Sequence, residues 1–136
     1  MLGDRHHTLV TRLSDCDRVV EVGVGRRPGV AAGLARHGVD VTATDIHQRP
    51  TPEGVRFVRD DVTDPDLGVY RDVDAVYARH CPPELQRPAR DVARTVGAAF
   101  LFTTLGGDPA VVEVRRVTTA DGTVFVADDP SQDGAD

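Results

Sequence analysis

A glycine-rich turn between a predicted strand and a predicted helix limits the folds open to this sequence. The β-branched run over 18–23 indicates a buried strand, and the pattern over 28–37 indicates a helix. Gly23 permits the tight turn between them, and Gly25 lets the backbone approach a ligand because it carries no Cβ. The start of the helix offers free N–H groups and a partial positive charge. This arrangement is typical of nucleotide-binding α/β proteins, although many such turns use glycine only for packing.

Strands and helices alternate along most of the chain. Beyond the first strand and its helix, we expect a helix over 5–15 and strands over 39–44, 55–58, 73–78, 98–104, 111–119 and 123–127. Pro88 is disfavoured inside a helix, so a turn over 83–87 and a main helix over 88–96 are expected. Asp121 and Gly122 separate the last two strands and predict a hairpin. We therefore expect an α/β fold with a mostly parallel sheet and an antiparallel C-terminal hairpin at one edge.

The length of 136 residues leaves room for one domain, which we expect to span 1–129. The tail over 130–136 has no apolar anchor, and we expect it to be disordered. No segment approaches the ~20 apolar residues that cross a membrane, and the N-terminus lacks the apolar core of a signal peptide. Cys16 and Cys81 lie far apart, and the histidines show no ligand spacing. We expect a cytoplasmic protein without a metal site.

The charged residues are unusual in kind: 18 Asp, 4 Glu and 16 Arg, with no Lys and a net charge of −6. Short carboxylates in place of lysine suit a cytoplasm with molar salt, where the self-repulsion of an acidic surface is screened. A GC-rich genome, whose codons favour arginine, explains the same composition. In either case the surface is a poor match for nucleic acid, which requires a basic stripe.

Acidic residues follow the ends of the second and third predicted strands. Asp45 lies 22 positions after Gly23, close to the spacing of about 20 that places a carboxylate beside the ribose of a bound nucleotide. Asp60, Asp61 and Val62 follow the third strand, where a carboxylate and the next N–H group could contact the edge of adenine. The alternative is that these acids are only solvated surface residues and contact no ligand. Their order favours an adenosine-containing small molecule as the ligand.

The stretch from Arg18 to Thr104 resembles the core of the Rossmann-like SAM-dependent methyltransferases, where SAM is S-adenosylmethionine. In that superfamily the first strand ends in an acidic-x-Gly-x-Gly motif, which corresponds to Glu21, Gly23 and Gly25. The resemblance implies a doubly wound sheet with the order 3-2-1-4-5 and SAM as the cofactor.

The same resemblance assigns the residues around the nucleotide. It places Asp45 on the ribose and Asp61 near the adenine amino group, with the Val62 N–H beside it. More narrowly, the chain is similar to a family of small uncharacterised archaeal proteins of this fold. The segment from Tyr77 to Glu84 carries that likeness.

The segment after the fourth strand holds the candidate catalytic residues. In methyltransferases this edge faces the transferred methyl group. Here His80 could act as a base, Arg79 could hold an anion, and Glu84 follows two prolines. Cys81 is either a nucleophile or, as we favour, a small buried apolar group. Cys81 and Glu84 depart from the pattern of enzymes that methylate amino groups, so the acceptor stays open.

Three functions remain in view. The first is a small SAM-binding protein and methyltransferase, in which a partner subunit or a second copy closes the acceptor site. The second is a non-enzymatic NAD(H)- or nucleotide-sensing module, which the run from Asp61 to Pro65 also fits. Glu21 and the crowding by Arg26, Arg27 and Pro28 argue against it. The third is a degenerate fold that binds no nucleotide and serves as an interaction protein.

Overall fold

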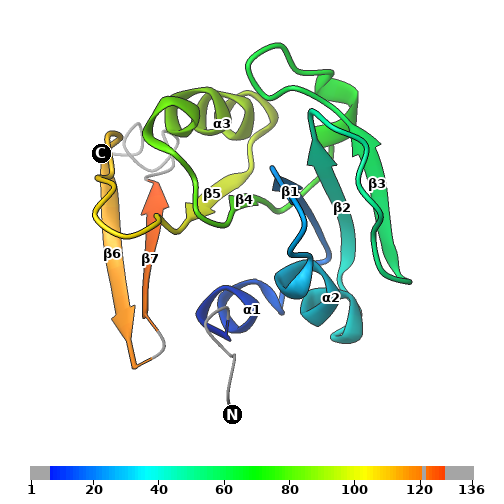
Figure 1. Cartoon of the computed structure of the whole chain (residues 1–136), viewed down its shortest axis with the longest axis horizontal. Helices are drawn as coiled ribbons and strands as arrows, with labels where there is room; N and C mark the ends of the chain where they lie inside the picture. The colour runs from blue at the N-terminus through cyan, green and yellow to red at the C-terminus, as the bar shows by residue number, and fades with distance from the viewer. Residues whose placement is uncertain (1–6, 121, 128–136) are drawn as a thin grey trace.

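Seven strands form one continuous sheet in this computed structural model, which describes residues 7–120 and 122–127. The strands are β1 (Arg18–Val22), β2 (Asp40–Asp45), β3 (Val55–Arg59), β4 (Ala75–Ala78), β5 (Ala99–Phe102), β6 (Val114–Thr119) and β7 (Gly122–Ala127). Their order is β3-β2-β1-β4-β5-β7-β6, as Figure 1 shows. The first five strands are parallel, while β7 and β6 are antiparallel. The predicted order and edge hairpin are confirmed; Asp121 and the expected tail over 130–136 lie outside the described residues.

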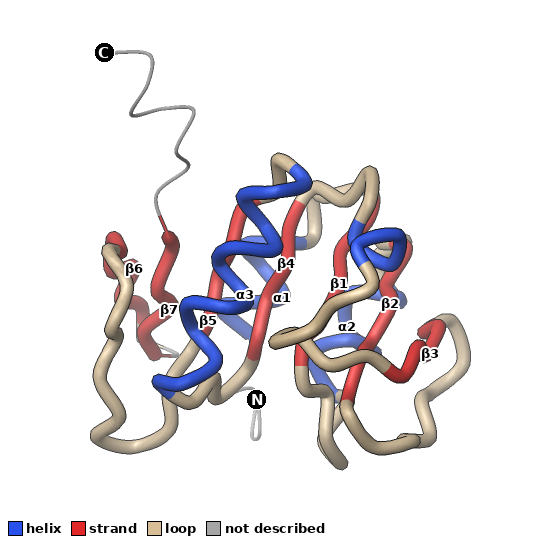
Figure 2. Tube along the Cα trace, turned by 90° about the horizontal axis from the view of Figure 1, so that it is seen from above, coloured by secondary structure: helices blue, strands red, loops and turns tan. Residues whose placement is uncertain are grey.

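Helices cover both faces of the sheet (Figures 1 and 2). They are α1 (His7–Leu13), α2 (Gly29–Arg36) and α3 (Pro83–Val96), and a short 3-10 helix, η2, spans Leu67–Tyr70. The helices α1 and α2 pack on one face with Val19, while α3 packs on the other with Val20 and Val22. Successive residues of β1 therefore pack into the apolar layers on opposite faces of the sheet, as expected for a parallel strand buried on both sides.

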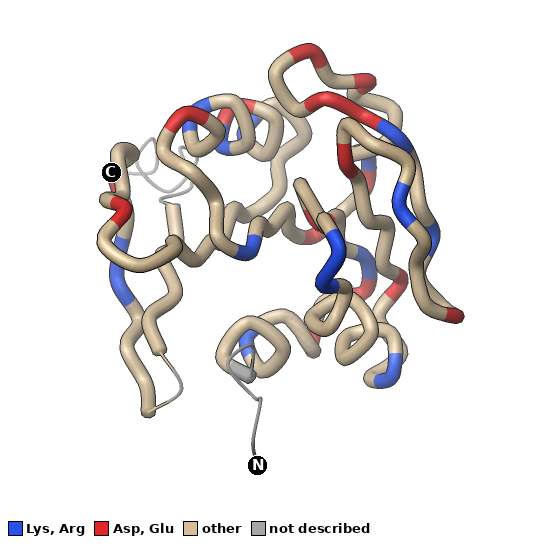
Figure 3. The backbone as a smooth tube through the Cα atoms, viewed as in Figure 1, with Lys and Arg blue, Asp and Glu red and all other residues tan. Residues whose placement is uncertain are grey.

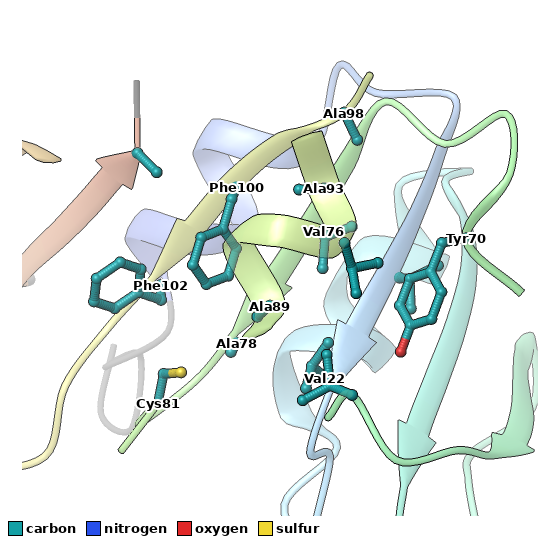
Figure 4. Packing of buried hydrophobic residues seen from close by; sticks show 14 of the residues in the cluster. Val22, Tyr70, Val76, Ala78, Cys81, Ala89, Ala93, Ala98, Phe100 and Phe102 are labelled. Atoms are coloured by element: carbon teal, nitrogen blue, oxygen red, sulfur yellow. The ribbon is translucent and has the colours of Figure 1, made fainter. Parts of the chain in front are cut away.

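The layer beneath α3 is built from small helical residues and aromatic strand residues. Figure 4 shows Ala89 and Ala93 of α3 near Phe100 and Phe102 of β5. The rings of Phe100 and Phe102 stack with their centres 5.1 Å apart. Because alanines occupy the facing side of α3, the helix can approach the sheet closely.

The prediction for α3 was wrong at its start. One helix runs from Pro83 to Val96 with Pro88 inside it, instead of a turn followed by a helix from 88. A proline in a helix loses one hydrogen bond and strains the preceding turn. Two contacts of the fully buried Gln86 help to offset that cost: its amide donates to the Pro109 carbonyl at 2.9 Å and accepts from the Val111 N–H at 2.6 Å. These contacts are distant in sequence, so the local proline rule misses them.

The connection from β5 to β6 has no helix, because residues 103–113, all of them described, form turns and irregular structure. Gln86 attaches this connection to α3, and Val112 is buried in the layer beneath the same helix. Within residues 7–120 and 122–127, no helix has the length and apolar character needed to span a membrane.

Candidate functional site

The glycine turn adopts the backbone conformation that the sequence predicts. Gly23 and Gly25 have φ angles of +72° and +59°, in the left-handed region that other residues rarely enter. The N–H groups of Gly23 and Val24 both donate to the Thr44 carbonyl at 2.9 Å. The turn is thereby fixed to the end of β2.

Asp45 connects the glycine turn to the loop after β2. Its Oδ2 accepts from the Gly25 N–H at 2.8 Å, and its Oδ1 accepts from the His47 N–H at 2.9 Å. The Arg49 Nε lies 3.5 Å from Oδ1 in an ion pair. The predicted neighbourhood of Asp45 and the glycine turn is therefore present as a direct hydrogen bond. Because each carboxylate oxygen can accept more than one hydrogen bond, acceptor capacity remains for a ligand.

A cavity of about 490 Å3 opens at the carboxyl ends of β1, β2 and β3. It brings together four of the six residues that the sequence assigns to the nucleotide, namely Gly23, Asp45, Asp61 and Val62. Ile46 and Leu85 add apolar walls, and the side chain of Ile46 is 53% exposed. A carboxylate beside apolar side chains can contact a small molecule that has both polar and apolar groups.

Asp60 and Asp61, the two acids after β3, have different surroundings. They belong to a segment rich in acidic residues, which Figure 3 shows in red. The Asp60 carboxylate accepts from the Asp66 N–H at 3.0 Å and from the Tyr70 hydroxyl at 2.9 Å, so it holds the local loop. The Asp61 Oδ1 accepts from the N–H and hydroxyl of Thr63, and these bonds lower the pKa of Asp61. Asp61 is exposed, and its Oδ2 accepts no hydrogen bond from the described residues.

Glu21 lies below the glycine turn, inside the core. Its Oε1 accepts from the Tyr77 hydroxyl at 2.7 Å, whereas its buried Oε2 has no hydrogen-bond partner among the described residues. Burial raises the pKa of Glu21 to about 7, against the opposing effects of the Tyr77 hydrogen bond and the Arg79 charge. Neither Glu21 nor Gly25 is among the described residues that line the cavity. Contact between these two and a ligand stays a prediction.

Arg79 and His80 lie together at the end of β4, which pairs with β1. The Arg79 guanidinium donates to the His80 Nδ1 at 2.9 Å, because a guanidinium has no acceptor. The His80 N–H donates to the Thr103 hydroxyl at 2.9 Å, and the φ angle of His80 is +54°. Glu84 is exposed in the first turn of α3. None of these three lines the cavity within the part of the chain that the structure describes.

Cys81 is a buried apolar group, as we favoured from the sequence, and is 2% exposed. Burial, with a smaller contribution from the Glu84 charge, raises the pKa of its thiol to about 12. The thiolate needed for nucleophilic attack is therefore scarce near neutral pH.

Sequence reasoning assigned no site role to several residues of the cavity, among them Ile46, Arg49 and Leu85. Ile46 could have been found, because an apolar residue directly after the predicted ribose acid occupies the same strand edge. Leu85 was missed because the sequence predicts a turn over 83–87, whereas α3 begins at Pro83 and carries Leu85 to the cavity.

Solved structures with a similar fold include methyltransferases. The CcbJ methyltransferase from Streptomyces caelestis has a TM-score of 0.59 and 21% identity, over 85% of this chain and 53% of that one. MtNAS in complex with S-adenosylmethionine has a TM-score of 0.57 and 14% identity, over 90% of this chain and 61% of that one. The chain therefore spans a little over half the length of these proteins, and at such identities the likeness shows the fold.

A relative from Halobacterium salinarum, a UPF0146 protein, is 60% identical over 123 residues, which cover 90% of this chain and 95% of the relative. The family model described as "Uncharacterised protein family (UPF0146)" matches residues 5–130. The chain therefore belongs to the UPF0146 family, and its Rossmann-like fold is similar to that of solved methyltransferases.

Proposed function

We propose that this protein binds S-adenosylmethionine, with the adenosine part in the cavity at the ends of β1, β2 and β3. The observation that carries the proposal is the placement of the Asp45 carboxylate in one cavity with Ile46, Leu85 and the Asp61–Val62 segment. A volume of about 490 Å3 is within the range of small-molecule sites.

The polar groups of the cavity match the groups of an adenosine. The remaining acceptor positions of Asp45 suit the two ribose hydroxyls. The free Oδ2 of Asp61 suits the amino group of adenine, while Ile46 and Leu85 suit the faces of its ring. The Val62 N–H donates to none of the described residues, which leaves it available for a ring nitrogen. This pairing of an acceptor and a donor at one edge is complementary to adenine.

We further propose methyl transfer as the activity. The sulfonium of the bound cofactor supplies an electrophilic methyl group, so the protein's task is to align an acceptor for in-line attack. Arg79 and His80 flank the glycine turn through the β1–β4 pairing, and there Arg79 can hold an anionic group. While Arg79 donates to the His80 Nδ1, that nitrogen cannot accept a proton, so His80 acts as a base only after this contact opens. A partner subunit or a second copy would complete the acceptor pocket.

The proposal is tested by calorimetric titration of the full chain with S-adenosylmethionine, S-adenosylhomocysteine, NAD and ATP in concentrated KCl. We expect the two sulfur compounds to bind and to stabilise the fold, by about 2.7 kcal/mol at 100 times the dissociation constant. A response to NAD alone would favour a dinucleotide-sensing module. No response to any of the four would contradict nucleotide binding.

Asp45→Ala is the variant that links this binding to the site, and Asp74→Ala is its matched control. The Asp74 Oδ2 also accepts from two backbone N–H groups, those of Asp17 and Arg18, but at the opposite end of β1. Both variants should lose stability, on the order of 1 to 3 kcal/mol. Only Asp45→Ala should weaken the binding of S-adenosylhomocysteine, by about tenfold or more. Equal affinities in the two variants would remove Asp45 from the binding site.

A further inference from the structure

A second cavity, of about 510 Å3, lies beside the first one. Arg26 and Pro28 contribute one wall from the glycine turn, and Gln48, Arg49 and Pro50 contribute the other from the loop after β2. Arg49 lines both cavities. The second cavity therefore begins where the proposed ribose site ends.

The lining of this cavity has the opposite charge to the rest of the molecule. The chain carries a net charge of −6, and the first cavity contains three aspartates. The second cavity contains two arginines and, among its described lining residues, no acid. The charged side chains that line it are therefore both cationic, with Asp45 paired to Arg49 from the side of the first cavity.

Both arginines have donors to spare. Within residues 7–120 and 122–127, Arg26 is exposed and forms no ion pair. The Arg49 side chain is 20% exposed, and its Nε lies 3.5 Å from Asp45 without forming a hydrogen bond. Elsewhere, Arg18 and Arg56 are both held by Asp40. Arg26 is therefore available to an external anion, and Arg49 keeps donors beyond its ion pair with Asp45.

The two walls are held at a fixed separation. Asp45 accepts from the Gly25 N–H on one side and from the His47 N–H on the other, and these residues adjoin Arg26 and Gln48. Pro28 and Pro50 further restrict the backbone of each wall. Because the walls are tied together, the arginines are brought near one another before any ligand arrives.

We propose that this second cavity binds a phosphate group. Guanidinium groups are planar donors that match phosphate oxygens two at a time. Pro28 is the N-cap of α2 and makes no side-chain capping bond, so the start of the helix adds partial positive charge to the same wall. The proposal does not depend on S-adenosylmethionine binding in the first cavity.

The phosphate can come from two sources, which share this chemistry. It can be attached to the ribose of an adenosine compound other than S-adenosylmethionine, whose ribose carries no phosphate, since Arg49 lines both spaces. It can also belong to a separate phosphorylated substrate. In the first case the phosphate and the adenosine bind as one molecule, and in the second they bind independently.

The experiment is a titration of the full chain, followed by NMR or calorimetry, with adenosine, adenosine 2′-phosphate, adenosine 3′-phosphate, and inorganic phosphate in the absence and presence of S-adenosylhomocysteine. It is performed at low and at molar salt, because screening weakens such contacts. Arg26→Gln is the test variant, and Arg71→Gln is the matched control, since Arg71 is also exposed but lines neither cavity. We expect Arg26→Gln to weaken phosphate binding about tenfold and Arg71→Gln to leave it unchanged.

Each outcome decides the matter. A ribose phosphate that binds far more tightly than adenosine supports the site with a ribose-borne phosphate. Phosphate that binds equally well with and without S-adenosylhomocysteine supports the site with a separate substrate. No saturable phosphate binding at low salt, or an equal loss in both variants, overturns the proposal. S-adenosylhomocysteine titrated alone into the wild-type chain tests the first cavity separately, so the two proposals can fail independently.

Discussion

The carboxyl group of Glu21 has no exposure to solvent, and one of its oxygens is without a partner among the described residues. Burial raises its pKa from 4.5 to about 7 in the folded protein. The folded state therefore binds this proton more tightly than the unfolded chain does. The resulting stabilisation is complete below about pH 4.5 and is lost as the pH rises to about 7.

We predict that the free energy of unfolding falls by roughly 2 to 3 kcal/mol more between pH 5 and 8 in the wild-type chain than in Glu21→Gln. Glutamine keeps an oxygen for the Tyr77 hydroxyl and removes the charge. Urea unfolding at several pH values measures the difference. Parallel pH profiles for the two chains would show that Glu21 does not titrate in this range.

The individual residues of the candidate site were predictable from the sequence where backbone geometry determines them. Gly23 and Gly25 have the positive φ angles that their place in the turn requires, and Asp45 reaches that turn. The burial of Glu21 against Tyr77 was not predictable, because it depends on the register between β1 and β4. A motif specifies residue types, whereas the partners of a buried carboxyl come from strands far away in the chain.

At the scale of elements, α3 is attached to the β5–β6 connection by one buried amide. Gln86 donates to the Pro109 carbonyl and accepts from the Val111 N–H, and it is fully buried. Gln86→Ala leaves these two backbone groups without partners and creates a cavity, so we predict a loss of about 2 to 4 kcal/mol. Chemical unfolding measures this loss, and Arg87→Ala, an exposed neighbour in the same helix, is the control.

A loss of unfolding free energy in Gln86→Ala no larger than that in Arg87→Ala would contradict this role.

The strands were predictable because β-branched runs and turn residues are local signals, and the β6–β7 hairpin is predicted by its Asp-Gly pair in the sequence. The start of α3 was not predictable, because Pro88 is unfavourable locally and the Gln86 contacts that offset it are non-local. That single error also concealed Leu85 as a wall of the cavity.

At the scale of the whole molecule, the chain has 22 acidic residues, 16 arginines and no lysine, and its net charge is −6. A relative with 60% identity comes from Halobacterium salinarum. Salt has two opposing effects on such a surface. It weakens the exposed ion pairs of Asp40 with Arg18 and Arg56, and it screens the repulsion among unpaired acids. Exposed ion pairs contribute little, so relief of the repulsion should dominate.

We predict that the melting temperature rises as the KCl concentration increases from tenths of molar to molar. We also predict that the acidic loop after β3, residues 60–66, contributes more to this rise than an isolated acid does. Asp64 lies within three positions of Asp61 and Asp66, whereas Asp108 is exposed and has no acid within four positions of it in the sequence. Removing one charge from the group reduces the repulsion that salt would otherwise screen. Asp64→Asn should therefore reduce the gain in melting temperature from salt more than Asp108→Asn does, as measured by thermal unfolding across the salt series. A melting temperature independent of salt would leave codon bias as the explanation for the missing lysines. Equal gains in the two variants would place the repulsion in the overall charge and not in this loop.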